Sequence, residues 1–280
     1  MRNTLAIARR EIRAYFSSPL AYVVIGVFLA LSGYIFWSAL IYYSDACLRY
    51  GSNPLYREQL NVNAMVIRPI FGNMGLLFLM LIPLLSMRLL AEERRTGTSE
   101  LLFTCPVTSA QVVLGKFLGA TGLLLVMLSG TLVHPFLLMA TEARPDMRSA
   151  LVGYLGILFM GMAFLGVGLL ISSLTENQIV AAVGSFGVLL VLWVISFVSE
   201  SITVPLGTVL NRLTAGIWSA VGLGLGGPGL GELSNSISLI EHFEDFRKGI
   251  LDTRHIVFYA TFIFLSLFLT QRVVESQKWR

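Results

Sequence analysis

The chain has 280 residues, of which 55% are hydrophobic and 13% charged, and its net charge at neutral pH is +4. Since a soluble domain carries about a quarter charged residues, this composition and a mean hydropathy of +0.77 indicate a membrane protein and exclude an ordinary soluble domain. The modest positive charge also argues against a nucleic-acid partner, because the basic residues stand at the edges of apolar blocks rather than in one stripe.

Residues 1–18 are basic and amphipathic, and they precede the first apolar block. Four apolar residues recur at helical spacing: Leu5, Ala8, Ile12 and Tyr15. Four arginines can face lipid headgroups: Arg2, Arg9, Arg10 and Arg13. This pattern predicts an interfacial helix, which Ser17, Ser18 and Pro19 then interrupt. A simple basic anchor beside the first span is the alternative.

Six apolar blocks follow, each close to the roughly 20 residues that a bilayer-spanning helix needs. They lack the alternation of barrel strands, so we expect helices. The predicted transmembrane helices are residues 20–43, 69–87, 110–140, 150–172, 178–199 and 255–271. The first block is too long for the apolar region of a signal peptide and is expected to stay uncleaved. The sequence thus predicts one all-α integral membrane domain over residues 1–280.

Six spans put both termini on one side of the membrane. Basic residues are denser near the span ends when that side is the cytoplasm, so we predict an N-in, C-in topology. Cys47 would then lie outside and Cys105 inside, which excludes a disulfide between them within one chain.

Residues 91–116, AEERRTGTSELLFTCPVTSAQVVLGK, form a polar interruption between the second and third blocks. Residues 92–95 are all charged and follow the second block directly, while Gly97 permits a turn. We expect a compact cytoplasmic unit over residues 91–108.

Capping signals divide this unit into two helical pieces. Thr98 is placed to cap a short helix with Glu100 in its first turn, and Pro106 ends that helix. Thr108 and Gln111 have the spacing of a capping box, so Thr108 is expected to begin the third span. A rigid unit of this kind is suited to docking on a cytoplasmic partner, although an interfacial connector that binds nothing has the same features.

The stretch AEERRTGTSELLFTCPVTSAQVVLGKFLGA resembles the hallmark of permease subunits of ABC-2-type ATP-binding cassette transporters. The family pattern corresponds to Glu92, Glu93, Arg94 or Arg95, Gly97, Thr98, Glu100, Leu102, Pro106, Gly115 and Lys116. SSLTENQIVAA and SISLIEHFEDFRKGILDTRHIVFY resemble most the gliding-motility-associated branch of these permeases. With IARREIRAYFSSPLAYV near the N-terminus, the resemblance covers essentially the whole chain.

The resemblance implies that residues 91–108 hold a coupling helix, which seats in a groove of a separate cytoplasmic ABC ATPase subunit. In that arrangement residues 92–95 hold the geometry, and Glu100, Leu101 and Leu102 meet the ATPase. It further implies a second permease copy, in a homodimer or heterodimer, within a bacterial inner (plasma) membrane. An auxiliary outer-side protein is compatible with it. In the outer-side loop, residues 200–253, it implies short outer-side or re-entrant helices, where a seventh span over 200–232 is the alternative.

A second cytoplasmic contact is predicted at residues 175–178, directly after the fourth span. The four residues are Thr175, Glu176, Asn177 and Gln178. Thr175 and Gln178 again have capping-box spacing, which would begin the fifth span. A plain connector explains the turn equally well.

Several motifs of enzymes are absent from the sequence. No G-x-x-x-x-G-K-[ST] loop occurs, and GLGGPG at 224–229 follows no predicted strand and contains Pro228, so the chain is not expected to be an enzyme or to bind a cofactor. ATP and Mg would be bound by the partner ATPase. HExxH and C-x-x-C motifs are also absent, and no metal site is expected.

Two groups of polar residues nevertheless allow other interpretations. The first could be a metal site or one side of an amphipathic helix: Glu241, His242, Glu244, Asp245 and Asp252. Their spacing matches no ligand pattern, so we favour a helix whose apolar side is Leu239, Ile240, Phe243, Phe246 and Ile250.

His134 is the chief ionisable residue inside a predicted span, and we expect it to be a packed side chain rather than a proton relay.

Because the spans hold almost no ionisable residues, energy for transport is expected from a partner rather than from a coupled ion. Three functions stay open. The chain is predicted to be an ABC-2 permease that moves cargo, most simply as an exporter; a force- or signal-transmitting membrane subunit is the alternative. A stand-alone channel or scaffold is the third, and the charged 91–108 unit disfavours it.

Overall fold

A computed structural model describes residues 2–51, 60–95, 97, 108–140, 145–202 and 238–277, with backbone only for 195–202 and 277. Every regular element in this part of the chain is helical. The elements are α1 (Arg2–Ser17), α2 (Pro19–Tyr50), η1 (Asn63–Ile67), α4 (Arg68–Ser86), α5 (Arg88–Arg95), α7 (Ser109–Thr131), α8 (Val133–Met139), α9 (Met147–Leu174), α10 (Gln178–Ile202), α13 (Leu239–Lys248) and α14 (Thr253–Gln277).

Five helical stretches are long and apolar enough to cross a membrane. They are Pro19–Tyr50, Asn63–Arg95, Ser109–Met139, Met147–Leu174 and Thr253–Ser276. α10 stands where the fifth of six spans was predicted, and its described apolar part, Gln178–Val194, is shorter than these. An all-helical membrane domain is therefore confirmed, whereas six spans and their orientation stay predictions. The loop at 200–232 lies almost wholly outside the described residues.

Local capping fixes where several of these helices begin. Ser18 Oγ accepts the amide of Leu20, and Pro19 occupies the first turn of α2, where a missing N–H costs nothing. Asp146 caps α9 by accepting the amide of Arg148 at 3.0 Å. The predicted break at residues 17–19 is confirmed, although α2 continues to Tyr50, beyond the predicted end at residue 43.

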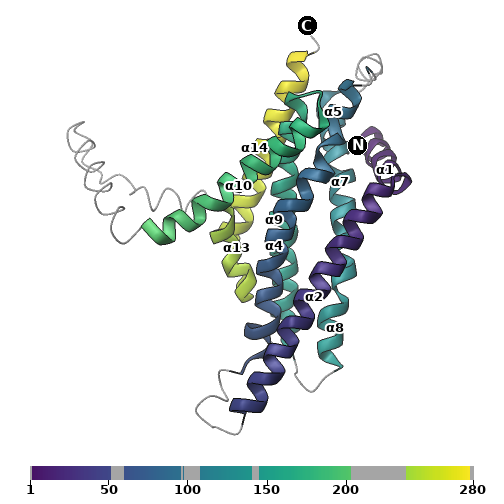
Figure 1. Ribbon diagram of the computed structural model, residues 1–280. Coiled ribbons are helices and arrows are strands. Elements are labelled where there is room, and N and C mark those ends of the chain that lie inside the picture. Colours follow the sequence, from purple (N-terminus) through teal and green to yellow (C-terminus); the bar gives the residue numbers. More distant parts are fainter. Residues whose placement is uncertain are drawn as a thin grey trace, which may run out of the picture.

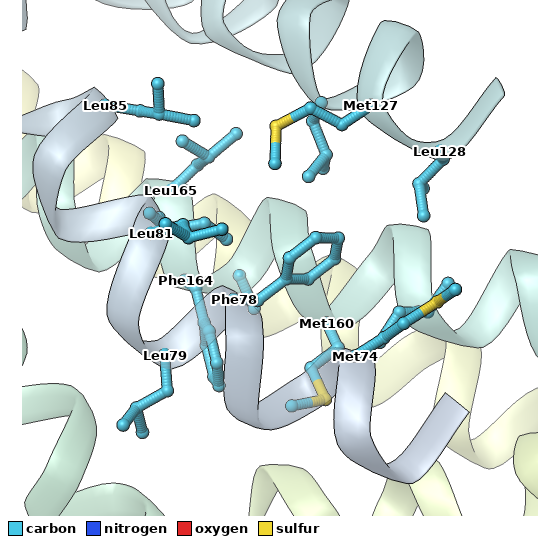
Figure 2. Packing of buried hydrophobic residues seen from close by; sticks show 14 of the residues in the cluster. Met74, Phe78, Leu79, Leu81, Leu85, Met127, Leu128, Met160, Phe164 and Leu165 are labelled. Atoms are coloured by element: carbon cyan, nitrogen blue, oxygen red, sulfur yellow. The ribbon is translucent and has the colours of Figure 1, made fainter. Parts of the chain in front are cut away.

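α4 and α9 lie at the centre of the bundle (Figure 1), and buried apolar side chains of both belong to one core cluster. Figure 2 shows Phe78 and Met74 of α4 beside Met160 and Phe164 of α9, with Met127 of α7 above them. α2 and α14 lie at the periphery: only 22% of the apolar window of each is buried, against 67% for the other three predicted spans.

Glycines of α9 lie against neighbouring helices, whereas not every glycine of α10 does. A Cβ at Gly161 would lie 2.8 Å from Leu124 Cδ2, so the missing side chain helps α7 and α9 to approach closely there. At Gly187 of α10, by contrast, an added Cβ would meet nothing within 4 Å.

α13 packs on α9 rather than standing alone between α10 and α14 (Figure 1). Ser238 caps its start and Gly249, with φ of 85°, ends it. Leu239, Phe243 and Phe246 are buried, as the amphipathic pattern predicts. Ile250 does not join this face: it is 54% exposed, because the helix ends before it.

Candidate functional site

α5 carries the charged residues that follow the second predicted span. α4 and α5 are separated at Met87, and the first turns of α5 bury Leu89, Leu90 and Ala91 against the bundle. Glu92 and Arg95 on its other side are exposed. The start of the 91–108 segment is thus an amphipathic helix built into the end of the bundle.

Four side chains from three helices form an ionic cluster around α5: Arg10, Glu11, Glu93 and Lys116. Lys116 of α7 is only 2% exposed, and its Nζ lies 2.9 Å from Glu93 Oε1 and 3.1 Å from Glu11 Oε1. Arg10 Nη2 lies 2.8 Å from Glu93 Oε1 and 3.1 Å from Glu11 Oε1. The two cations and two carboxylates balance, so Lys116 is buried as a charge with partners.

The ionic cluster is better understood as a device for orientation than as a source of stability. Removing a lysine ammonium from water costs several kcal/mol, which the attraction of its partners roughly offsets. The cluster instead sets the orientation of α5, since Glu93 pairs with Arg10 of α1 and with Lys116 of α7 at the same time. α5 is therefore fixed relative to both helices.

α1 reaches the cluster because glycines on α7 let it approach closely. A Cβ at Gly115 would lie 2.7 Å from Ile7 Cβ, and one at Gly119 would lie 2.6 Å from Glu11 Cβ. One side of α1 is thus packed on α7, while its arginines are exposed on the other side. Leu5, on the apolar side predicted for an interfacial helix, is 64% exposed, whereas the side that packs on α7 runs through Ile7, Ala8 and Glu11.

Tyr15 connects α1 to the break between α4 and α5. Its hydroxyl donates to the backbone carbonyl of Leu85 at 2.9 Å, and the guanidinium of Arg88 lies 4.5 Å from its ring centroid. Burial raises the pKa of Tyr15, an effect that Arg88 opposes, so the hydroxyl keeps its proton and acts as a donor.

The other side of α5 is bound to the end of α9. Arg94 Nη1 donates to the carbonyl of Ser173 at 2.7 Å, and Ser172 Oγ accepts the amides of Leu90 and Ala91 at 3.1 Å each. The two predicted cytoplasmic segments, 91–108 and 175–178, therefore begin next to each other.

The start of α10 corrects one predicted cap. Asn177, not Thr175, caps this helix: Asn177 Oδ1 accepts the amide of Ile179 at 2.9 Å. Thr175 is extended at the end of α9, and its hydroxyl accepts the amide of Asn177 instead. The predicted capping box between Thr175 and Gln178 is therefore wrong, because the Thr175 hydroxyl pairs with Asn177 and the cap of α10 is Asn177.

The capping box at the start of α7 is confirmed. Thr108 Oγ1 accepts the amide of Gln111, and Gln111 Oε1 accepts the amide of Thr108. Gly97 takes a left-handed conformation with φ of 69°, and its amide donates to the carbonyl of Arg94, in agreement with the predicted turn. Five predicted contact residues lie outside the described part of the chain: Thr98, Glu100, Leu101, Leu102 and Pro106.

Sequence reasoning missed the partners of Lys116 and α5, namely Glu11 and Ser172. Glu11 had one available signal: it is the only acidic residue before Asp45. An isolated acid within a basic amphipathic helix suggests a specific cationic partner.

The other polar groups do not assemble into a second site in the described residues. Asp245 Oδ2 lies 2.9 Å from His255 Nε2, and Glu244 pairs with Arg247. Within the described ranges, no three His, Cys, Asp or Glu side chains lie together in a way that could hold a metal ion. His134 is 8% exposed and stacks on Phe36 with ring centroids 4.7 Å apart, which is the packed side chain expected of it.

Residues 5–269 match the model of the ABC-2 family transporter protein. No curated protein matches the chain.

Proposed function

Because this chain belongs to the ABC-2 transporter family and is a membrane permease subunit of such a transporter, we propose that its 91–108 segment receives the motion of a separate cytoplasmic ATPase. Glu100, Leu101 and Leu102 meet the ATPase, while residues 92–95 keep the segment in position. ATP hydrolysis takes place in the partner, and this subunit converts the resulting displacement into movement of its spans.

The observation that carries the proposal is the fixation of α5 from three directions. The ionic cluster joins α5 to α1 and α7, and Arg94 joins it to α9. A segment that starts from a fixed helix transmits a push to the bundle, whereas one that starts from a slack loop absorbs it. These contacts therefore support a mechanical role for the segment that follows.

The turn at residues 175–178 is proposed as a second, smaller contact with the same ATPase. The link from Arg94 to the carbonyl of Ser173 supports this, because it brings the turn next to the start of the 91–108 segment. One ATPase surface could then touch both.

The complete transporter is proposed to contain two permease copies, identical or different, and two ATPase subunits in a bacterial plasma membrane. Each permease has six spans, with both termini in the cytoplasm and α10 as the fifth span. The C-terminal end of α14 lies at the same end of the bundle as α1 and α5, which supports this arrangement (Figure 1). Export is the proposed direction of transport.

A second candidate function is the transmission of force or a signal to an outer-side protein. The length of α2 favours it: 32 residues extend about 48 Å, beyond the roughly 30 Å hydrocarbon core of a bilayer. Leu48 near its far end is 83% exposed. An auxiliary protein could bind there.

Purification of the tagged protein from its native host in mild detergent, with mass spectrometry of what accompanies it, tests the proposal. We expect a near-stoichiometric soluble ATPase, which Glu100→Arg removes. Glu275→Arg is a matched control, because it makes the same change on α14, outside the coupling contacts. Retention of the ATPase by Glu100→Arg would contradict the role of the segment, and an outer-side protein in similar amount would favour the second candidate.

A further inference from the structure

Ser172 of α9 places its side chain at the break between α4 and α5. A helix end leaves backbone groups without intrahelical partners. Ser172 Oγ accepts from the amides of Leu90 and Ala91 in the first turns of α5, and donates to the carbonyl of Met87 at 3.0 Å. One hydroxyl thus satisfies a carbonyl at the break and two amides in the first turn of α5.

This contact is closed to water. Ser172 is 0% exposed, and so is Ser86 at the end of α4. The two helices touch here, because a Cβ added at Gly168 of α9 would collide with the Ser86 side chain. Hydrogen bonds in such a site are stronger than in water, and an unpaired polar group costs more. The hydroxyl therefore holds α5 to α9 in one geometry.

Both ends of α5 are bound by the same turn of α9. Ser172 holds its first turns, and the carbonyl of the next residue, Ser173, accepts from Arg94 near its last turn. Directly after this turn the chain passes through Asn177 into α10. A tilt of α5 must therefore move the end of α9 and the start of α10, unless these hydrogen bonds break.

We propose that Ser172 is a positioning residue that carries the displacement of α5 to α9 and α10. This inference rests on the proposed function, since it needs an ATPase that moves the 91–108 segment. The ionic cluster joins the other side of α5 to α1 and α7. Motion of α5 therefore passes to α1 and α7 through the ionic cluster and to α9 and α10 through Ser172. Loss of the Ser172 hydroxyl disconnects α9 and α10 while leaving the ATPase bound and active.

A fluorescent reporter on α10 tests the inference. Ile179 is 72% exposed in the first turn of α10, so Ile179→Cys, in a background with Cys47→Ser and Cys105→Ser, accepts an environment-sensitive dye. The complex with its ATPase is placed in lipid nanodiscs, and the change in fluorescence on adding ATP and orthovanadate is measured beside ATP hydrolysis.

We expect Ser172→Ala to lose most of the ATP-dependent fluorescence change while the amount of bound ATPase and its hydrolysis rate stay the same. Ser172→Thr keeps a hydroxyl and should restore the change. Ser173→Ala is the matched control, because Ser173 Oγ donates to the carbonyl of Leu170 within α9; it should leave the change intact. A monodisperse elution profile for each variant shows that the bundle has folded.

The possible failures are distinguishable. A full fluorescence change in Ser172→Ala, with ATPase bound, overturns the role of Ser172 and leaves the proposed function standing. Equal loss in Ser172→Ala and Ser172→Thr also overturns it, because the hydroxyl is then not what matters. Absence of an ATPase from the unsubstituted complex contradicts the proposed function, and this inference with it.

Discussion

Lys116 and Glu93 form an ion pair that joins the first turns of α7 to the charged helix after α4, with Nζ and Oε1 2.9 Å apart. The side chain of Lys116 is 2% exposed and that of Glu93 is 18% exposed. If either residue were removed, the charge of the other would stay in a position that water reaches poorly. This pair is therefore one of the contacts that fix the start of the 91–108 segment, together with those of Arg94 and Ser172.

Lys116→Met is expected to destabilise the protein, because it leaves Glu11 and Glu93 close together without their buried cation. Removal of one partner from a fully buried pair costs about 3–5 kcal/mol. Here Arg10 still contacts both carboxylates, so we expect a loss near the lower end of that range. The apparent Tm in detergent measures it.

A double-mutant cycle provides the control for this pair. Glu93→Gln removes the carboxylate charge that faces Lys116, and the double variant Lys116→Met/Glu93→Gln has no stranded charge at that position. We expect the double variant to lose clearly less stability than the sum of the single variants. Additive losses would show that the two residues act independently.

The parts of this fold that sequence could predict are those set by solvent or by near neighbours in the chain. A lipid solvent requires long apolar helices, so five of the six predicted spans reappear as helices of spanning length. The cap at Thr108 acts within three residues and was predicted, as was the break at residues 17–19, where the structure adds that Ser18 caps α2. At α10, Thr175 and Asn177 are both residue types that cap helices, and the structure places the cap at Asn177, whose Oδ1 accepts the amide of Ile179.

The site was predictable only where a family resemblance pointed to it. Lys116 was identified in this way, but its partner Glu11 is 105 residues away in the chain, and no periodicity connects the two. Ser172 was missed for the same reason, since its partners Leu90 and Ala91 are 82 and 81 residues away. Such pairs depend on how α1, α5 and α9 pack, which a local pattern does not contain.

Gly119→Leu is expected to detach α1 from α7. A Cβ at this position would already lie 2.6 Å from Glu11 Cβ and 3.2 Å from the carbonyl oxygen of Ala8, and overpacking of this kind costs about 1–3 kcal/mol. Limited trypsin digestion reports the change, because detached arginines of α1 are cleaved faster. Gly26→Leu on α2 is the control, since a Cβ there meets nothing within 4 Å. Equal digestion of both variants would contradict the close packing of α1.

Tyr15→Phe separates the two contacts of Tyr15. It removes the hydroxyl that donates to the Leu85 carbonyl but keeps the ring beneath Arg88. We expect a loss of about 1 kcal/mol, as for one buried hydrogen bond, seen as a lower apparent Tm. Tyr22→Phe should change nothing measurable, because Tyr22 is 58% exposed. A Tyr15→Phe protein as stable as the unsubstituted one would mean that the Leu85 carbonyl finds another donor.

His242 is expected to make α13 sensitive to acid. Its ring stacks on Phe258 with centroids 3.8 Å apart, and its Nδ1 lies 2.8 Å from the carbonyl oxygen of Ser238. Burial lowers the pKa of His242 below its ordinary 6.5, an effect that the Ser238 carbonyl and the carboxylates of Glu241 and Asp245 oppose and the nearby His255 reinforces.

Because the folded state holds the proton of His242 less tightly than the unfolded chain does, its contribution to stability is present above about pH 6.5 and falls as the pH drops below that value. We therefore expect the apparent Tm to decrease between pH 7.5 and pH 5.5 by more in the unsubstituted protein than in His242→Gln, which cannot take up a proton there. The variant keeps His255 and every other ionisable group, so the two proteins differ at residue 242 alone. The same decrease in both would assign the acid sensitivity to other groups, and a smaller decrease in the unsubstituted protein would reverse the sign of the proposed effect.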